Sequence, residues 1–402
     1  MYTLYICKFK RLIAALGIAA LLLPLSGCDG SIYANFREVD TMQLVQTLGL
    51  DSENPHVRVT ISTGAGTESM PGVVISRKAE SIVTAMRSLQ DYSAKEELYF
   101  SHTRYALLGE AAAKGCFGEF IDYVLRNTKL RMDTVPFVVR GGDAKSIITL
   151  SGEESYEITE ALSAVERDIK QSGLSYPFSC REVSRSLSEY GGALVCAVAG
   201  KKTEDSVFSK SGELTVVPAG YAILKDGKLA GFLGLDESRG ANLLTNRYGI
   251  GAIDLKLSDG EPYSLLPDES SCELHAVFDE SGRLRQLQAK VKISAGLTET
   301  SSPLDPLDPD TEKMLNAALS EKVESWCGAA LSRSVKTRCD FLGLYGILLK
   351  QYPRELSKET DDFMTVLSEA ELSVLVEGSV KHSYNLQKPV ATSGEENSNA
   401  KQ

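Results

Sequence analysis

The residues that could carry out chemistry are thinly spread in this chain of 402 residues. It has four histidines, and they lie far apart: His56, His102, His275 and His382. It contains no HExxH, GxSxG or phosphate-loop motif, and its Gly64-Ala65-Gly66 lacks the third glycine of a dinucleotide loop. Metal sites need clustered ligands, and covalent catalysis needs a nucleophile beside a base. The sequence therefore predicts no metal site, no cofactor and no catalytic residue.

Acidic clusters give no stronger signal. The pairs Glu153-Glu154 and Asp361-Asp362 are typical of solvated surface. The most unusual cluster, Asp236 to Gly240, follows a predicted strand and mixes both charges. A capped turn that leads into a helix explains this cluster better than a ligand site does.

Cys28 is the residue to which the sequence assigns a modification. Three basic residues (Lys8, Lys10 and Arg11) precede an apolar run at 12–25, which is shorter than the ~20 residues of a spanning helix. These are the parts of a secretory signal peptide. The cleavage region, Leu25-Ser26-Gly27-Cys28, resembles a bacterial lipobox, which implies removal of residues 1–27 and diacylation of Cys28. An ordinary signal peptide with an incidental Cys28 is the alternative.

Composition narrows the class of protein. The formal charge is −11, and loss of the three cations of the leader brings the mature chain near −14. An acidic body is not expected to bind nucleic acid, or to stay on anionic lipid by charge alone. A length of 402 residues with 43% hydrophobic content predicts two or three domains with substantial cores.

Six further cysteines remain in the mature chain: Cys116, Cys180, Cys196, Cys272, Cys327 and Cys339. An even number in an exported protein permits disulfides, and Cys180–Cys196 is the best-placed pair. The wide spacings and the lack of a CxxC motif favour buried thiols instead.

Residues 28–200 are predicted to form an N-terminal α/β domain. A helical pattern opens at Arg37 and is ended by Gly49. Alternation and apolar runs predict strands at 56–62, 73–75, 105–108, 135–139 and 193–198. Amphipathic spacing predicts a helix at 78–91, and two further helices are expected through 111–113 and at 117–125. Strands that alternate with helices indicate a sheet covered by helices, and the polar stretch 201–211 indicates a domain boundary.

The remaining chain is richer in strands. Residues 213–300 form the middle part, with a hairpin at 221–233 around Asp226-Gly227 and strands at 252–258, 271–278 and 284–293. Residues 301–385 contain a long helix, capped by Asp308 and begun by Pro309, and a final strand at 370–383. Residues 386–402 are a polar tail that we expect to be disordered. The predicted fold class is multi-domain α+β, with mixed β-sheets flanked by helices and a long C-terminal helix.

These segments, taken in order, resemble one family, the Ger(x)C lipoproteins, which are the C subunits of spore germinant receptors. The matching segments after the lipobox are Arg37 to Asp40, Leu48 to Asp51, Phe100 to Glu110, Leu125 to Asn127 with Arg131, Ala144 to Ile148, Gly220 to Gly240, Asp340 to Gly346 and Tyr352-Pro353. The family usually has Trp after the lipid-bearing Cys, after the position of Gly240 and beyond that of Pro353, and this chain does not.

The resemblance implies a non-catalytic subunit, anchored through Cys28 at the outer face of the cell membrane, here the spore inner membrane. It implies two integral-membrane partners, subunits A and B, with which the chain triggers germination when nutrients appear.

Two other classes of protein have a similar size and tether. A solute-binding lipoprotein of a nutrient transporter would have a second α/β lobe that repeats the first, and the strand-rich C-terminal half offers none. A lipid-anchored hydrolase would need a nucleophile with a base. The neighbouring genes would distinguish a receptor subunit from a transporter component.

Overall fold

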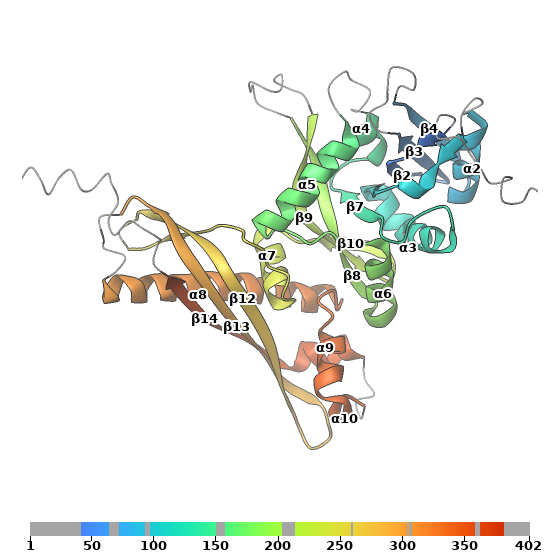
Figure 1. Cartoon of the computed structure of the whole chain (residues 1–402). Helices are drawn as coiled ribbons and strands as arrows, with labels where there is room; N and C mark the ends of the chain where they lie inside the picture. The colour runs from blue at the N-terminus through green and yellow to red at the C-terminus, as the bar shows by residue number, and fades with distance from the viewer. Residues whose placement is uncertain are drawn as a thin grey trace, which may run out of the picture.

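The structure is a computed structural model that describes residues 42–63, 72–92, 97–149, 157–202, 214–258, 260–302, 304, 308–357 and 362–381. Within these ranges the chain forms an eight-stranded sheet, a four-stranded sheet and a pair of short strands. The short pair joins β1 (Met42–Leu44) to β5 (Glu97–Tyr99) in parallel. The two larger sheets form the two ends of the molecule (Figure 1).

The eight-stranded sheet has the order β10-β9-β8-β7-β6-β2-β3-β4. Its central strands β2, β6, β7 and β8 are parallel, and antiparallel strands extend it on both sides. The strands are β2 (Thr47–Glu53), β3 (His56–Ser62), β4 (Val74–Ala79), β6 (Tyr105–Gly109), β7 (Val135–Val139), β8 (Gly192–Lys202), β9 (Leu214–Lys225) and β10 (Lys228–Phe232).

Helices cover both faces of this sheet. In β6, Tyr105 and Leu107 belong to one hydrophobic cluster and Ala106 and Leu108 to the other, because successive side chains of a strand point to opposite faces. One face carries α4 (Ala144–Thr149) and α5 (Ile158–Ser172). The other carries α2 (Ile82–Tyr92), α3 (Glu110–Arg126) and α6 (Cys180–Tyr190). The short 3-10 helix η3 (Phe100–His102) precedes β6.

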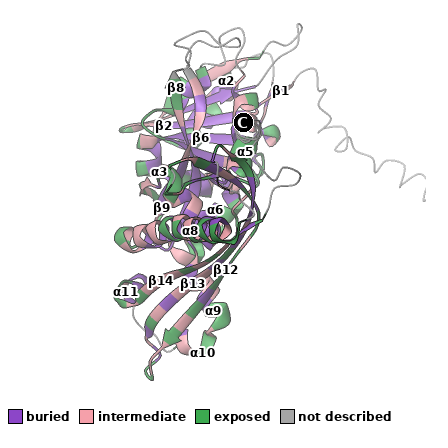
Figure 2. Cartoon of the chain, turned by 90° about the vertical axis from the view of Figure 1, so that its left-hand side faces the viewer, coloured by how far each residue is buried: buried purple, intermediate pink, exposed green. Residues whose placement is uncertain are grey.

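The C-terminal part is built on the sheet β11-β12-β13-β14. Its strands are β11 (Ile253–Lys256), β12 (Pro262–Phe278), β13 (Leu284–Thr300) and β14 (Glu371–Lys381), and only the β13–β14 pair is parallel. One face of this sheet packs on α8 (Pro309–Thr337), which also contacts α7 (Leu235–Leu244). The short helices α9 (Leu344–Gln351), α10 (Pro353–Leu356) and α11 (Phe363–Glu369) precede β14. Figure 2 shows more exposed surface here than around the larger sheet.

The long helix begins as predicted. The Asp308 carboxylate accepts a hydrogen bond from the backbone N–H of Thr311 at 3.1 Å, and Pro309 occupies the first helical turn. The apolar stripe of α8, from Leu315 to Ala330, is buried against the sheet and α7. The predicted fold class is confirmed: mixed sheets flanked by helices, with this long helix in the C-terminal part.

The helix predicted from Arg37 to Gly49 is wrong where the structure describes it. Residues 42–44 form β1, and Gly49 lies within β2 instead of ending a helix. The reason is tertiary: β2 lies between β3 and β6, so Leu48 and Leu50 are buried inside the sheet. A Cβ at Gly49 would lie 2.5 Å from the Ile148 side chain, so this glycine admits α4 onto the strand.

Other differences are smaller. Residues 78 and 79 belong to β4, so the predicted helix at 78–91 starts at Ile82. The two helices predicted after β6 form one helix, α3, with a kink at Cys116. The predicted hairpin at 221–233 consists of β9 and β10, which continue the N-terminal sheet beyond β8. The predicted bounds of the domains stay a prediction, and the tail at 386–402 lies outside the described residues.

Candidate functional site

Several residues of the ordered motifs meet at the carboxyl ends of β2 and β6. The Asp51 carboxylate accepts hydrogen bonds from the backbone N–H groups of Ala144 at 2.7 Å and Lys145 at 2.9 Å. A Cβ at Gly109 would lie 2.1 Å from Asp51 Oδ1, so glycine leaves room for the carboxylate. Burial raises the pKa of Asp51, although both amides act in the opposite direction. This carboxylate caps α4 and has no partner that suggests a reaction.

The segment around Arg104 ties β6 to α5. Glu166 of α5 accepts from Tyr105 Oη at 2.8 Å and pairs with Arg104 at 2.9 Å and Lys170 at 3.0 Å. Burial acts to raise the pKa of Glu166, but the bonds from Lys170 and Tyr105 outweigh it and lower the pKa. Burial also raises the pKa of Tyr105 to about 12. Neither group is poised to exchange a proton near neutral pH, so the arrangement is a packing contact.

The mixed cluster Asp236 to Gly240 forms the first turns of α7. The backbone N–H of Gly234 donates to Glu237 at 2.7 Å, and Glu237 pairs with Arg333 of α8 at 3.0 Å. The Arg239 guanidinium lies 5.0 Å from the centre of the Trp326 ring. The interpretation as a capped turn into a helix is therefore confirmed, and the charges of the cluster dock α7 on α8.

Asp340 organises the segment that precedes α9. Its carboxylate accepts from the backbone N–H groups of Leu344 and Tyr345, each at 2.8 Å. Burial raises its pKa to about 6, although these amides act to lower it. A Cβ at Gly346 would lie 2.4 Å from Tyr190 Oη, so α9 approaches α6 closely at this point. Asp340 and Gly346 of this motif thus place α9 against Tyr190 of α6.

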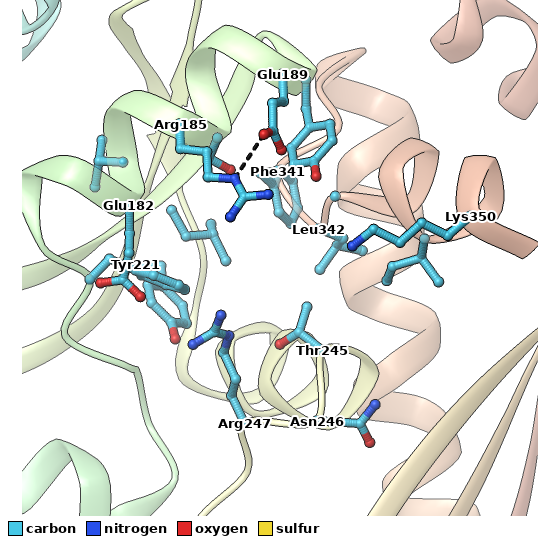
Figure 3. Close-up of a pocket in the computed structure, with 17 residues that line it drawn as sticks. Glu182, Arg185, Glu189, Tyr221, Thr245, Asn246, Arg247, Phe341, Leu342 and Lys350 are labelled. Atoms are coloured by element: carbon cyan, nitrogen blue, oxygen red, sulfur yellow. Dashed lines mark hydrogen bonds and ion pairs between the residues drawn. The ribbon is translucent and has the colours of Figure 1, made fainter.

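A cleft of about 350 Å³ lies between α6, the end of α7 and α9 (Figure 3). Three cations from three elements line it: Arg185, Arg247 and Lys350. Figure 3 shows the guanidinium groups of Arg185 and Arg247 facing each other across the cleft, with the Lys350 ammonium directed toward them. Arg185 donates to Glu189 at 2.8 Å through Nε, and within the described residues its terminal nitrogens have no further hydrogen-bond acceptor.

Arg247 is held by aromatic rings. Its guanidinium lies 4.5 Å from the centre of the Tyr176 ring and 4.8 Å from that of Phe178. It forms no ion pair with an acid in the part of the chain that the structure describes. Glu182 and Glu189 also line the cleft, so its three cations stand against two acids.

Several polar groups that line the cleft are engaged in structural contacts. No histidine or cysteine is among its lining residues. The Tyr221 hydroxyl is fully buried, accepts from the Tyr176 N–H at 2.5 Å and donates to Asn242 at 2.6 Å. Burial raises the pKa of Tyr221 well above its ordinary value. The two carboxylates of the lining are already engaged, since Glu182 accepts hydrogen bonds from Ser179 and Glu189 accepts one from Arg185.

Sequence reasoning did not single out Arg185, Arg247 or Lys350. By its local pattern, each is an ordinary surface cation. Arg185 and Arg247 are separated by more than 60 positions in the sequence, and Lys350 lies further along the chain. No local signal marks such a set, because only the packing of three elements brings it together.

The histidines and cysteines of the described part of the chain do not form a cluster. Among the described residues no group of three or more His, Cys, Asp or Glu side chains could hold a metal ion. His56, His102 and His275 lie in or beside separate elements, and His382 lies outside the described residues. All six described cysteines are free thiols, so the pair Cys180–Cys196 is not bonded. Burial raises the pKa of Cys180 and of Cys196 to about 12.

The lipid site lies beyond the part of the chain that can be described. Cys28 and the leader at 1–27 are outside the described residues, so diacylation of Cys28 stays a prediction. No helix within the described ranges is both long and apolar enough to cross a membrane.

Comparison with known proteins gives consistent matches along the chain. The profile for the spore germination protein N-terminal domain matches residues 35–199. The profile for the spore germination B3/GerAC-like C-terminal domain matches residues 219–384. Spore germination protein KC of Bacillus subtilis (strain 168) is 23% identical over 386 residues, which cover 88% of this chain and 90% of that protein.

A solved structure supports the fold. The crystal structure of the GerBC protein superposes with a TM-score of 0.57 and 17% identity, covering 83% of this chain and 96% of that chain. At this level of identity the likeness concerns the fold alone. The two profiles together span most of the described residues, in the order N-terminal domain then C-terminal domain.

Proposed function

Since the chain belongs to the Ger(x)C family of spore germination proteins, we propose that it is the lipid-anchored, non-catalytic C subunit of a spore germinant receptor. The observation that carries the proposal is the match of both family profiles, over 35–199 and 219–384. The name of the Bacillus subtilis relative, a spore germination protein, supports the same process.

The anchor and the location are part of the proposal. The run Leu25-Ser26-Gly27-Cys28 after an apolar leader supports diacylation of Cys28 and a position at the outer face of the spore inner membrane. A lipid tether raises the effective concentration of the body near any partner in the same membrane. The acidic body, with a formal charge of −11 for the whole chain, favours protein partners over anionic lipid.

A non-catalytic role is supported by the geometry of the described residues. The buried carboxylates Asp51 and Asp340 cap helices, and neither histidine nor cysteine lines the cleft between α6 and α9. We propose that the chain acts in assembly and signalling with two integral-membrane subunits, A and B, and carries no cofactor, metal or nucleic acid.

Deletion of the chain from spores tests this function. We expect the response to one germinant to be lost, while germination by unrelated stimuli continues, because other receptors do not depend on this subunit. The measurement is the loss of absorbance of spore suspensions after each stimulus, with a complemented strain as control. If deletion instead impaired uptake of one nutrient, and the isolated body bound that nutrient at micromolar concentration, a solute-binding lipoprotein would be the correct function.

A further inference from the structure

Strand β14 has one edge that no other strand covers in the described part of the chain. It lies at the end of the order β11-β12-β13-β14 and pairs with β13 alone. Near its carboxyl end, α8 takes up the outward amides: Gly378 N–H donates to Ser320 Oγ at 3.0 Å and Val380 N–H to Asn316 Oδ1 at 2.6 Å. The helix therefore covers the strand edge at this end.

At its amino-terminal end, β14 directs backbone amides outward in the same way, but among the described residues α8 does not accept hydrogen bonds from them. In a parallel pair, alternate residues direct their N–H and C=O groups away from the partner strand. The register with β13 is continuous, so Leu372, Val374 and Val376 face the same way as Gly378 and Val380. No hydrogen-bond partner for these three outward amides occurs within the described residues. An uncovered strand edge of this kind can pair with another extended chain.

A groove of about 810 Å³ runs between this edge and α8. Its apolar lining comes from Leu331 and Val335 of the helix and from Leu372 and Val374 of the strand. Gly328 of α8 also lines it, and a Cβ at this glycine would meet no atom within 4 Å. Figure 2 shows exposed and half-buried residues along both elements, α8 and β14.

The charges of the groove restrict its occupant. Two acids, Glu321 and Glu324, and one cation, Lys336, line it, and none of the three forms an ion pair within the described ranges. With two acids against one cation, the groove disfavours nucleic acid and anionic lipid and favours a basic group beside the acids. Free main-chain donors and acceptors select an extended polypeptide, since strand addition supplies affinity through backbone hydrogen bonds.

We propose that the β14 edge binds an extended segment of a partner protein by strand addition. The segment places alternate apolar side chains in the groove and a basic residue beside Glu321 and Glu324. This inference rests on the proposed function, because the partner it assigns is an integral-membrane subunit of the receptor.

Two substitutions are designed to disrupt this contact while leaving the fold intact. Val374→Pro removes one outward N–H, and proline is tolerated at edge positions whose N–H does not serve the ladder. Gly328→Gln places a side chain in the groove where the structure has open space. Gly115→Gln is the matched control, because Gly115 is an exposed helical glycine of α3 that also meets no atom within 4 Å.

The experiment uses the full, lipid-bearing chain with an affinity tag, extracted from spores in mild detergent. The membrane subunits recovered with it are quantified by mass spectrometry, and hydrogen exchange is compared between complex and isolated chain. We expect Val374→Pro and Gly328→Gln to reduce recovery at least tenfold and Gly115→Gln to leave it unchanged. In the wild-type complex, exchange at residues 372–376 should be slowed.

Different failures have different meanings. If Val374→Pro and Gly328→Gln recover the membrane subunits as well as the wild-type chain does, the strand-addition site is overturned and the proposed function stays intact. The same follows if hydrogen exchange at 372–376 is not slowed in the complex. No recovery of membrane proteins by the wild-type chain would overturn both. A concentration-dependent dimer that Val374→Pro abolishes would show that the edge binds a second copy, and would overturn the assignment to a membrane subunit.

Discussion

Two motif positions, 51 and 340, are occupied by aspartates whose buried carboxylates hold the start of a helix. Asp51 and Asp340 each accept two backbone amides at the start of a helix, α4 and α9 respectively. Each lies beside a glycine that allows a close approach, Gly109 for the first and Gly192 for the second. Their role is to fix the start of a helix, which needs a carboxylate but no reaction.

Asp340 gives a prediction about pH. Its pKa is raised from 3.8 to about 6 by burial, so the folded protein binds the proton more tightly than the unfolded chain does. The stabilisation is complete below pH 4 and is lost as pH rises through 6, which lowers the free energy of unfolding by about 3 kcal/mol. Urea unfolding of the chain without its leader, measured from pH 4 to pH 7, checks this contribution.

The control for Asp340 is the amide. Asp340→Asn removes the titrating group and leaves one of two amides without an acceptor, which costs about 1–3 kcal/mol at every pH. The variant should therefore lack the fall between pH 4 and pH 6 that the wild-type protein shows. The same pH profile in both proteins would contradict the assignment of this fall to Asp340.

Cys28 gives a prediction about the mature chain. We expect residues 1–27 to be absent and the Cys28 thiol to carry a diacylglycerol, because Leu25-Ser26-Gly27-Cys28 follows an apolar leader. Mass spectrometry of the first peptide measures both. Cys28→Ala should move the protein to the soluble fraction, whereas an unmodified Cys28 or a different first residue would exclude the lipid anchor.

Pairs of elements are held by close backbone approach as well as by side chains. In the contact of α7 with α8, a Cβ at Gly240 would lie 1.9 Å from the Trp326 carbonyl oxygen. The same helix pair is joined by Glu237–Arg333 and by Arg239 above the Trp326 ring. The glycine sets the distance between the helices, and the charged residues set which faces meet.

A pair of glycine substitutions tests this contact. Gly240→Ala should lower the free energy of unfolding by about 1–3 kcal/mol or more, because the new methyl group meets backbone that cannot rotate away. Gly328→Ala, in the open part of α8, should raise it by about 0.5–1 kcal/mol through helix propensity. Denaturant unfolding measures both, and equal effects of the two substitutions would contradict the close contact.

The molecule as a whole has a core that crosses between its two sheets. One hydrophobic cluster includes Leu162 of α5, Tyr221 of β9, Leu243 of α7 and Val291 of β13. The cleft at Arg185, Arg247 and Lys350 lies along this junction. The halves are therefore expected to unfold together, and their relative position to be fixed in the absence of a partner.

This packing predicts the behaviour of the isolated body. Residues 30–385, without leader or tail, should fold as a stable monomer with one cooperative unfolding transition and no bound cofactor. Light scattering gives the mass, calorimetry the number of transitions, and elemental analysis with absorbance spectra any metal or nucleotide. Two separate transitions would contradict the shared core, and stoichiometric metal or nucleotide would contradict the absence of a cofactor.

Sequence alone determined the elements whose pattern is local. Alternation predicted β3, the apolar run predicted β7, and Asp308 with Pro309 predicted the start of α8. The ordered motifs were sufficient to indicate the family, because each is a short local run of residues and the set keeps the family's order along the chain.

Tertiary structure alone decided the remaining features. Residues 42–48 have helical spacing, but Leu48 and Leu50 are buried in a strand between β3 and β6. The cationic cleft and the uncovered edge of β14 each depend on elements far apart in the chain. Local propensity is worth a fraction of a kcal/mol per residue, so burial between distant segments overrides it. A site made by several elements exists only after they have packed.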